Sequence, residues 1–244
     1  MKKHIKSLLD NTARILSGRI YSFITIFNLL PSKKVLTFRN TDTSIWNTIV
    51  SRFFIMVARF SINKKIIKKE VNFVVVDDSF KMSLNVNEYT QCNYYFSFPS
   101  EGLIDLIKLG GDTFIDIGAN VGFFSLYASK RFKNVVAFEP TQASVDLLKN
   151  NFKMNDIKNL SLHELALSDE SGKSTFYENP LNQGGNSLEK FEENQQKIPK
   201  ENWPVYDVEV LRLDDLNLNE NQNLKEIDLI KIDVEGHESK VLKG

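Results

Sequence analysis

The pattern of apolar and polar positions changes at Asp112, where short apolar runs begin to alternate with longer segments of helical spacing. Alternation of strand and helix is typical of a parallel sheet with crossover helices. Strands of such a sheet are covered on both faces and are apolar almost throughout, as "TFIDI" and "VVAF" are. The predicted elements are strand 113–118, helix 122–132, strand 134–140, helix 141–155, a third strand 159–168 and a fourth strand from 226 to Asp233.

Different patterns precede and interrupt this alternating region. Residues 1–30 and 44–69 have helical character, and the β-branched segment 71–86 predicts a β-hairpin. A further helix is expected over 100–111, with Gly110 and Gly111 at its end. Residues 173–216 predict an inserted hairpin with a long polar loop. We therefore expect a mostly helical N-terminal extension (1–70), a hairpin with a connecting segment (71–99) and an α/β domain (100–244).

Charge divides the chain in a way that the formal net charge of zero conceals. Residues 1–70 hold 14 Lys and Arg against three Asp and Glu, a balance of +11, and residues 71–244 hold 17 against 28, a balance of −11. A basic arm on an acidic body can bind anionic lipid, nucleic acid or the body itself. Cys92 is the only cysteine, so no disulfide can form within the chain, which fits a reducing compartment.

Membrane attachment is a second question that residues 1–70 raise. The apolar run 20–30 lacks a small-residue cleavage site, and Arg52 and Arg59 interrupt the apolar run 45–62, so we predict neither a signal peptide nor a spanning helix. The segment 45–62 fits a helix packed on the protein body or one lying in a membrane interface. The expected location is cytoplasmic, with peripheral contact to anionic membranes through residues 1–70.

Candidate chemistry is concentrated where the first predicted strands end. Asp116 lies at the end of the first strand, Gly118 and Gly122 bracket the turn into the next helix, and Glu139 ends the second strand. Ligands of open parallel sheets bind outside the carboxyl ends of the strands, and glycine lets the backbone approach them closely. An acidic residue about 20 residues beyond such a turn is placed to bind ribose hydroxyls. An ordinary tight turn between strand and helix is the simpler interpretation.

Two kinds of adenosine-bearing cofactor can be compared with this turn. A dinucleotide site needs G-x-G-x-x-G, whereas the chain has Gly118-Ala119-Asn120-Val121-Gly122. Asp116 would place negative charge near a pyrophosphate, which is unfavourable. A cofactor with a cationic amino-acid end, such as S-adenosylmethionine, suits the carboxylate better.

Five motifs in order carry a resemblance to a known family. They are "DTFIDIGANVGFFSLYAS", "VVAFEP", "HELALSDESG", "VLRLDDL" and "IDLIKIDVEGHESKVLKG". Together they resemble the FkbM family of S-adenosylmethionine-dependent methyltransferases, over roughly residues 95–244. The resemblance implies a Rossmann-like class I methyltransferase sheet and methylation of a hydroxyl, often on a sugar or natural product.

The resemblance also implies roles for individual residues. Asp233, Glu235 and His237 would face the methyl group and the acceptor, and either Asp233 or His237 could be the base that an alcohol acceptor requires. His237 could equally be a surface histidine at a helix start, and Glu235 a carboxylate favoured by the helix dipole. No Cys/His cluster indicates a metal. The residues expected around the cofactor are Asp116, Gly118, Ala119, Asn120 and Gly122 in the loop, Glu139 at the ribose, and Ala166, Leu167 and Ser168 beside the adenine.

Three classes of function therefore stay open. The favoured one is an O-methyltransferase that acts on a sugar hydroxyl in a glycan or glycolipid. A nucleotide-dependent oxidoreductase and a non-catalytic, membrane-binding adaptor with a methyltransferase-like domain are the alternatives. The acceptor would be a small molecule or glycan, and no specific nucleic acid is expected.

The end of the chain adds one expectation. A class I methyltransferase sheet normally has seven strands, but only seven residues follow His237. We therefore expect a C-terminal truncation of a longer enzyme, with the strand "IDLIKID" as an unpaired apolar edge. Exposed edges promote aggregation or pairing with another chain, so this chain is expected to be poorly soluble or oligomeric and weakly active.

Overall fold

The computed structural model describes residues 35–36, 70–75, 80–85, 88, 90–91, 94, 101–179, 183–189, 204–216 and 226–244. These residues belong to two compact units, Met1–Glu101 and Gly102–Gly244. Apart from one short strand and Glu70, the predicted N-terminal extension of residues 1–70 lies outside the described residues, and so do its predicted helices and membrane contact. No helix of the described part is long and apolar enough to cross a membrane.

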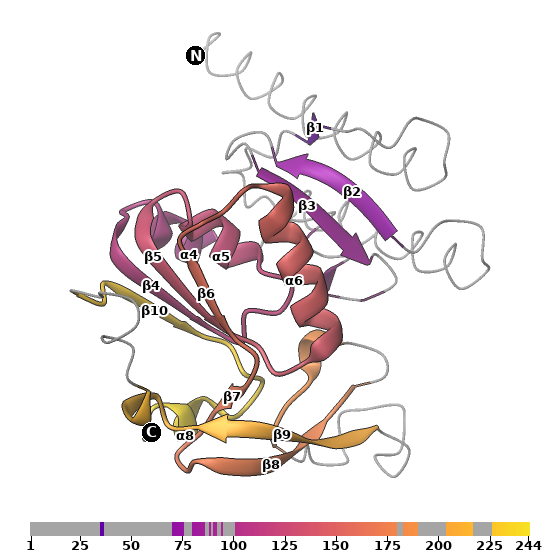
Figure 1. The fold of residues 1–244 in the computed structure, drawn as a ribbon, viewed down its shortest axis with the longest axis vertical. Coiled ribbons are helices and arrows are strands. Elements are labelled where there is room, and N and C mark those ends of the chain that lie inside the picture. Colours follow the sequence, from indigo (N-terminus) through magenta and orange to yellow (C-terminus); the bar gives the residue numbers. More distant parts are fainter. Residues whose placement is uncertain are drawn as a thin grey trace, which may run out of the picture. The chain divides into compact units, whose positions relative to one another are not determined.

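The first unit contains a small three-stranded sheet (Figure 1). β2 (Glu70–Val75) pairs antiparallel with β3 (Phe80–Asn85), and β1 (Val35–Leu36) pairs parallel with β2. Alternating apolar side chains of β3 are fully buried, namely Phe80, Met82 and Leu84. The hairpin predicted over 71–86 is therefore confirmed.

The second unit is built on a parallel four-stranded sheet in the order β10-β4-β5-β6. Its strands are β4 (Gly111–Ile117), β5 (Phe132–Phe138), β6 (Leu160–His163) and β10 (Leu229–Ile232). The chain builds outward from β4 through β5 to β6 and then returns to place β10 on the other side of β4. This reversal creates a switch point beside β4, where open α/β sheets bind their ligands. The predicted α/β class and the parallel sheet are confirmed.

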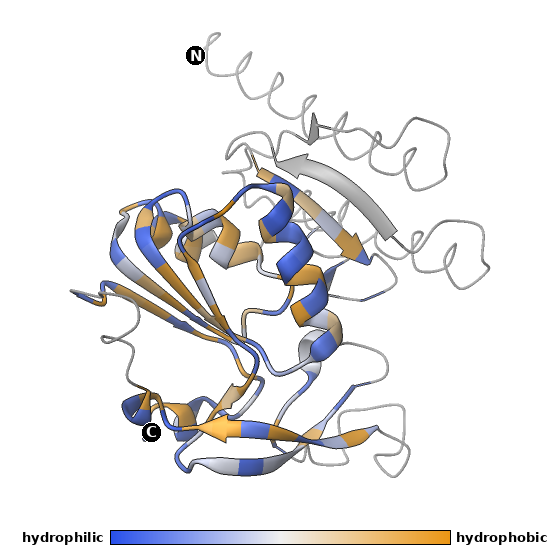
Figure 2. Cartoon of the chain, in the orientation of Figure 1, coloured by the Kyte–Doolittle hydropathy of each residue, from blue (hydrophilic) through white to orange (hydrophobic). Residues whose placement is uncertain are grey.

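Two layers cover this sheet. The connections from β4 to β5 and from β5 to β6 contain α5 (Phe123–Ala128) and α6 (Gln142–Met154), which lie on the same side of the sheet (Figure 1). Right-handed crossovers require that placement. Figure 2 shows the mixture of hydrophobic and hydrophilic positions along α6 that is expected of a helix with one buried face. α4 (Glu101–Ile107) precedes β4 and buries Ile104 and Ile107.

The opposite face is covered by the inserted segment and the C-terminal helix. Alternate residues of β4 and β5, such as Ile115 and Phe138, form a core with Leu165, Leu167 and Val241. Val241 belongs to the short helix α8 (Glu238–Val241). Because strand side chains alternate between faces, Asp116 must point to the other face, toward α5.

The predicted third strand, 159–168, is wrong in one respect, because it is two strands in two sheets. β6 ends at His163, which pairs with Phe138 at the last position of β5. Beyond Phe138 the chain turns, and Pro140 has no N–H to offer, so residues after His163 find no partner there. β7 (Ala166–Leu167) instead pairs with β9 (Val205–Leu211).

The inserted hairpin predicted within 173–216 is confirmed as the rest of this second sheet. β8 (Gly172–Tyr177) pairs antiparallel with β9, and the order is β7-β9-β8. Figure 1 shows this sheet beyond the end of β6, next to α8. At the far edge of the parallel sheet, β10 pairs with β4 alone among the described residues, and Ile230 is 42% exposed. The expected aggregation stays a prediction.

Candidate active site

The turn after β4 is left-handed at three positions. The backbone angle φ is +76° at Gly118, +50° at Asn120 and +82° at Gly122. A Cβ on Gly118 would collide with the carbonyl oxygen of Asp233, and one on Gly122 would lie 2.9 Å from Leu148 Cγ. Both positions therefore need glycine, the first because the end of β10 passes directly against the turn.

Backbone bonds hold this turn against the neighbouring strand. The N–H groups of Gly118 and Ala119 both donate to the carbonyl oxygen of Phe138, each over 3.0 Å. The N–H of Gly122 donates to Ala119 O over 2.9 Å. The predicted cofactor loop is therefore a rigid feature anchored to the end of β5, which suits a site that must keep its shape.

Asp116 is fully buried behind the turn and not at its open side. Ser125 Oγ donates to Asp116 Oδ2 over 2.6 Å. The Lys231 ammonium forms an ion pair with Asp116 Oδ1 at 3.0 Å and donates to the carbonyl oxygen of Gly118 over 2.8 Å. The negative charge of Asp116 is thus balanced within the protein. Direct contact between Asp116 and a cationic cofactor end stays a prediction, and the geometry assigns the side chain a supporting position beneath the loop.

Sequence reasoning missed Lys231, although the sequence contained a signal for it. Lys231 is 8% exposed and comes from β10, the neighbour of β4. It is the one charged residue within the apolar strand Leu229–Ile232. Lysine is rarely buried unless it is paired, so a lysine inside a predicted buried strand indicates an acidic partner on an adjacent strand.

Glu139 joins the end of β5 to the turn. Its Oε2 accepts a hydrogen bond from the N–H of Asn120 over 2.8 Å, and its Oε1 accepts one from the N–H of Thr141 over 2.9 Å. Burial raises the pKa of Glu139, although these hydrogen bonds and Lys231 oppose the rise. The Thr141 side chain also hydrogen-bonds to this carboxylate, so only part of its acceptor capacity stays available to a ligand hydroxyl.

Asp233 and Glu235 follow β10 and are exposed. The Asp233 N–H donates to Ile117 O over 3.1 Å, which holds the residue beside the turn. Its Oδ2 lies 3.8 Å from Lys231 Nζ. Partial burial and the neighbouring carboxylates of Asp233 and Glu238 raise the pKa of Glu235. Asp233 is therefore an exposed residue whose backbone passes against Gly118.

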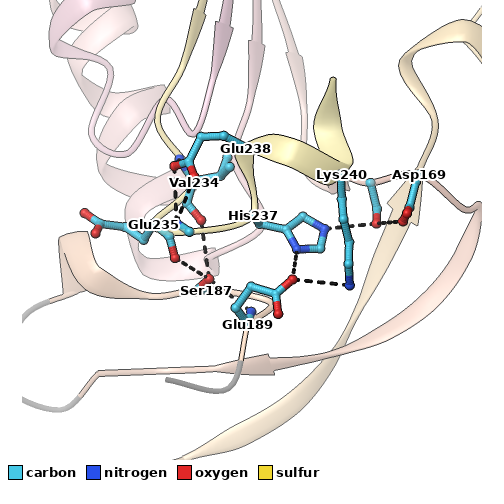
Figure 3. Close-up of polar contacts among 10 residues, drawn as sticks. Asp169, Ser187, Glu189, Val234, Glu235, His237, Glu238 and Lys240 are labelled. Carbon is cyan, nitrogen blue, oxygen red and sulfur yellow. Dashed lines mark hydrogen bonds and ion pairs between the residues drawn. The ribbon is translucent and has the colours of Figure 1, made fainter. Parts of the chain in front are cut away.

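His237, the other candidate base, is in a different setting. Its side chain is enclosed, and the residue is 3% exposed. Nδ1 lies 2.7 Å from Glu189 Oε1, and Nε2 lies 2.9 Å from Ser168 Oγ (Figure 3). Both ring nitrogens therefore face protein groups, and neither is directed at Asp233 or the glycine turn by any hydrogen bond.

The residues predicted beside the adenine lie partly within the core. Ala166 packs in a cluster with Phe176 and Val208, and Leu167 packs with the apolar residues of β4 and β5. Ser168 is 8% exposed, and its hydroxyl lies beside His237. A role for these three residues at an adenine stays a prediction.

Two groups of predicted site residues are thus brought together. The first surrounds the turn and contains Asp116, Gly118, Ala119, Asn120, Gly122, Glu139 and Asp233. The second joins Ser168 to His237 through a direct contact. Glu189 also belongs to the second group, and sequence reasoning could not find it in a polar loop 48 residues before His237. Within the described ranges, no group of three or more His, Cys, Asp or Glu side chains is arranged to hold a metal ion.

Comparison with known proteins identifies a family that the chain matches. A family described as "Methyltransferase FkbM domain" matches residues 116–244. Methyltransferase 1 of Beauveria bassiana (strain ARSEF 2860) is 34% identical over 155 residues, which cover 57% of this chain and 61% of that protein. The 2-O-methyltransferase NoeI of Sinorhizobium fredii (strain NBRC 101917 / NGR234) is 30% identical over 156 residues, or 58% and 60% of the two chains.

These matches are partial in length. The chain spans about three fifths of the length of the curated relatives it matches. Among solved structures, a methyltransferase FkbM from Methylobacillus flagellatus KT aligns with a TM-score of 0.34 and 16% identity. That alignment covers 55% of this chain and 28% of the other.

Proposed function

The chain belongs to the methyltransferase FkbM domain family, and from that premise we propose that it transfers a methyl group from S-adenosylmethionine to a hydroxyl of a sugar in a glycan or glycolipid. One observation carries the proposal: Glu139 and Asp233 flank the Gly118–Gly122 turn at the carboxyl ends of β5 and β10, the two parallel strands on either side of β4. This is the switch point of the sheet, where a ligand is expected. Family membership favours methyl transfer over the oxidoreductase alternative.

The residues around the turn fit such a cofactor. Without a Cβ at Gly118 the end of β10 can pass directly against the turn, and the remaining acceptor capacity of Glu139 can receive a hydrogen bond from a ribose hydroxyl. The buried pair of Asp116 and Lys231 fixes the loop from below. When bound, the cofactor supplies a methyl carbon that is already activated by its sulfonium, so the protein mainly positions the reactants.

Asp233 is the proposed base for the acceptor. A hydroxyl has to lose its proton as the new bond forms, and a positioned carboxylate can accept it. Asp233 is exposed and lies against Gly118, whereas the ring nitrogens of His237 are enclosed. A carboxylate base next to the cofactor loop is the arrangement that methyl transfer to an alcohol needs.

An acceptor with hydroxyl groups is supported by chemistry and by the name of one relative. Asp233 and Glu235 present two exposed carboxylates at the same loop, and carboxylates accept hydrogen bonds from vicinal hydroxyl groups. The Sinorhizobium relative is named as a 2-O-methyltransferase. The direct test is incubation of the 244-residue chain with labelled S-adenosylmethionine and glycan extracts, followed by identification of the labelled product. Cofactor binding without any transfer would instead favour the non-catalytic adaptor.

Replacing Glu139 by alanine is expected to weaken S-adenosylmethionine binding by about 1.5–3 kcal/mol, or roughly 10–150-fold, because hydrogen bonds to a charged group are lost. Calorimetry measures this, with Glu164→Ala as a control at an exposed glutamate. The raised pKa of Glu139 also predicts how the affinity for S-adenosylmethionine depends on pH. On acidification Glu139 is protonated at a higher pH than an exposed glutamate, and affinity should fall as the pH drops through that value. Unchanged affinity in a folded Glu139→Ala protein would contradict the assignment.

Residues 1–70 are proposed to contact anionic membranes. Their +11 balance beside the apolar segment 45–62 supports this, because each basic residue near an anionic surface contributes about 1 kcal/mol. Cosedimentation with vesicles containing phosphatidylserine is expected at low salt and should weaken as salt screens the charges. A chain that stays in the supernatant at low salt would indicate that the arm serves another purpose.

A further inference from the structure

We infer that His237 is a positioning residue. Its contact with Glu189 holds residues 187–189 of the insertion against the loop after β10, and this fixes the carboxylates of Asp233 and Glu235. The inference deepens the proposed function and rests on it for the identity of the acceptor site. We call the contacts of Ser187 and Glu189 with residues 234–240 the clasp.

Hydrogen-bonding chemistry defines what His237 can do. The hydrogen bond from His237 lowers the pKa of Glu189, so Glu189 is an ionised carboxylate and can only accept. His237 Nδ1 therefore carries the proton of the 2.7 Å bond to Glu189 Oε1. The remaining nitrogen, Nε2, faces the hydroxyl of Ser168 at 2.9 Å. Nε2 is thus directed at Ser168 and not at the loop that carries Asp233 and Glu235.

Ser187 and Glu189 make further polar contacts with residues of the same loop and of α8. Ser187 Oγ lies 2.8 Å from the carbonyl oxygen of Glu235 and 3.3 Å from that of Val234. Glu189 Oε1 also pairs with Lys240 Nζ at 3.2 Å. Figure 3 shows Ser187 and Glu189 on one side of the loop, with their dashed contacts running to residues before and after Gly236.

The loop after β10 has a conformation that needs such support. Glu235 and Gly236 both have left-handed backbone angles, with φ of +53° and +96°. A left-handed conformation costs a residue with a Cβ about 1–2 kcal/mol. α8 is only four residues long, although Glu238 accepts hydrogen bonds from the N–H groups of Val234 and Gly236. External contacts are therefore required to hold Asp233 and Glu235 in one arrangement.

The clasp is itself anchored to a strand. Ser187 forms an antiparallel bridge with Tyr177, the last residue of β8, through hydrogen bonds of 2.9 and 3.2 Å. The second sheet thus holds Ser187 and Glu189 in place, and these two residues in turn hold the loop after β10. In this arrangement the insertion between β8 and β9 sets the position of the groups that meet the acceptor.

The same side chains could also be compared with the Ser-His-acid centre of a hydrolase. The nucleophilic serine of a hydrolase must be accessible to the substrate and lie beside an oxyanion hole. Ser168 is 8% exposed, and its hydroxyl donates its one proton to Asp169 Oδ1 over 3.1 Å. The geometry therefore favours positioning over nucleophilic catalysis.

Two matched variants of the full chain test the inference, His237→Gln and Glu189→Gln, with Glu170→Gln as an exposed control on another turn. Each clasp variant is expected to lower kcat for methyl transfer by about 10–100-fold, because small misplacement of reacting groups is costly. The double variant should lose no more than either single one, since both break the same contact. Cofactor affinity should not change, because neither residue contacts the glycine turn or Glu139.

The pH profile separates positioning from catalysis. If His237 only positions the loop, kcat of His237→Gln is lower than that of the wild-type chain at every pH. The fall of kcat toward acidic pH is retained. Loss of that fall in His237→Gln, with full activity in Glu189→Gln, would make His237 the base and overturn the inference. Full activity in both variants would overturn it as well.

Hydrogen exchange provides a readout that does not depend on activity. Amide exchange in a peptide covering residues 233–240 is expected to become at least about 10-fold faster in Glu189→Gln and to stay unchanged in Glu170→Gln. Unchanged exchange in Glu189→Gln would refute the clasp. If the wild-type chain shows this protection but binds no S-adenosylmethionine, the proposed function fails and the clasp survives. Glu189 is only partly buried, so this variant serves even if His237→Gln does not fold.

Discussion

Replacing Lys231 by methionine is expected to lower the free energy of unfolding by about 3–5 kcal/mol, the range observed when one partner of a buried ion pair is removed. Methionine keeps most of the volume of the side chain but removes the ammonium. Asp116 would then remain fully buried, with Ser125 as its only polar partner among the residues that the structure describes. A buried carboxylate without a counter-charge is strongly unfavourable.

Urea unfolding of the full chain measures this loss, and two further variants make the result specific. Lys149→Met removes the lysine of an exposed pair with Glu164 and should cost less than about 1 kcal/mol. The double variant Asp116→Asn/Lys231→Met removes both charges and should recover most of the stability. A loss for Lys231→Met no larger than that for Lys149→Met would show that Asp116 is not held as a buried ion.

Replacing Asp233 by asparagine is expected to slow methyl transfer by about 10²–10⁴-fold, the usual contribution of a positioned base. Asparagine has nearly the same shape, and the backbone bond from residue 233 to Ile117 O is kept. The side chain is 59% exposed, so stability should change little. Affinity for S-adenosylmethionine should stay the same, because the change affects the acceptor's proton and not the ribose contacts.

Single-turnover rates with excess chain measure the chemical step for Asp233→Asn. Asp214→Asn is the matched control, since Asp214 is an exposed aspartate in the short helix Leu213–Asp215, remote in sequence from the turn. Full activity in a folded Asp233→Asn protein would show that Asp233 is not the base. His237 would then be the remaining candidate.

The sequence alone determined the parallel sheet and the position of the glycine turn. Apolar runs that end in Asp116 and Glu139 predicted neighbouring strands, and the carboxyl ends of parallel strands meet at one edge of a sheet. The pairing of β4 with β5 confirms that arrangement. The family resemblance stated from five ordered motifs is confirmed by the match over residues 116–244.

Only the tertiary structure decided which groups face one another within that frame. Lys231 reaches Asp116 because the chain returns from β6 to the far side of β4, a step that depends on the packing of the whole sheet. Glu189 reaches His237 because the insertion returns to pair Ser187 with Tyr177 at the end of β8, and a polar loop has no periodicity that predicts where it will lie. Local patterns specify elements because period and turn chemistry are local properties. The choice between Asp233 and His237 as base depends on burial and hydrogen-bond partners, which arise from residues distant in the sequence.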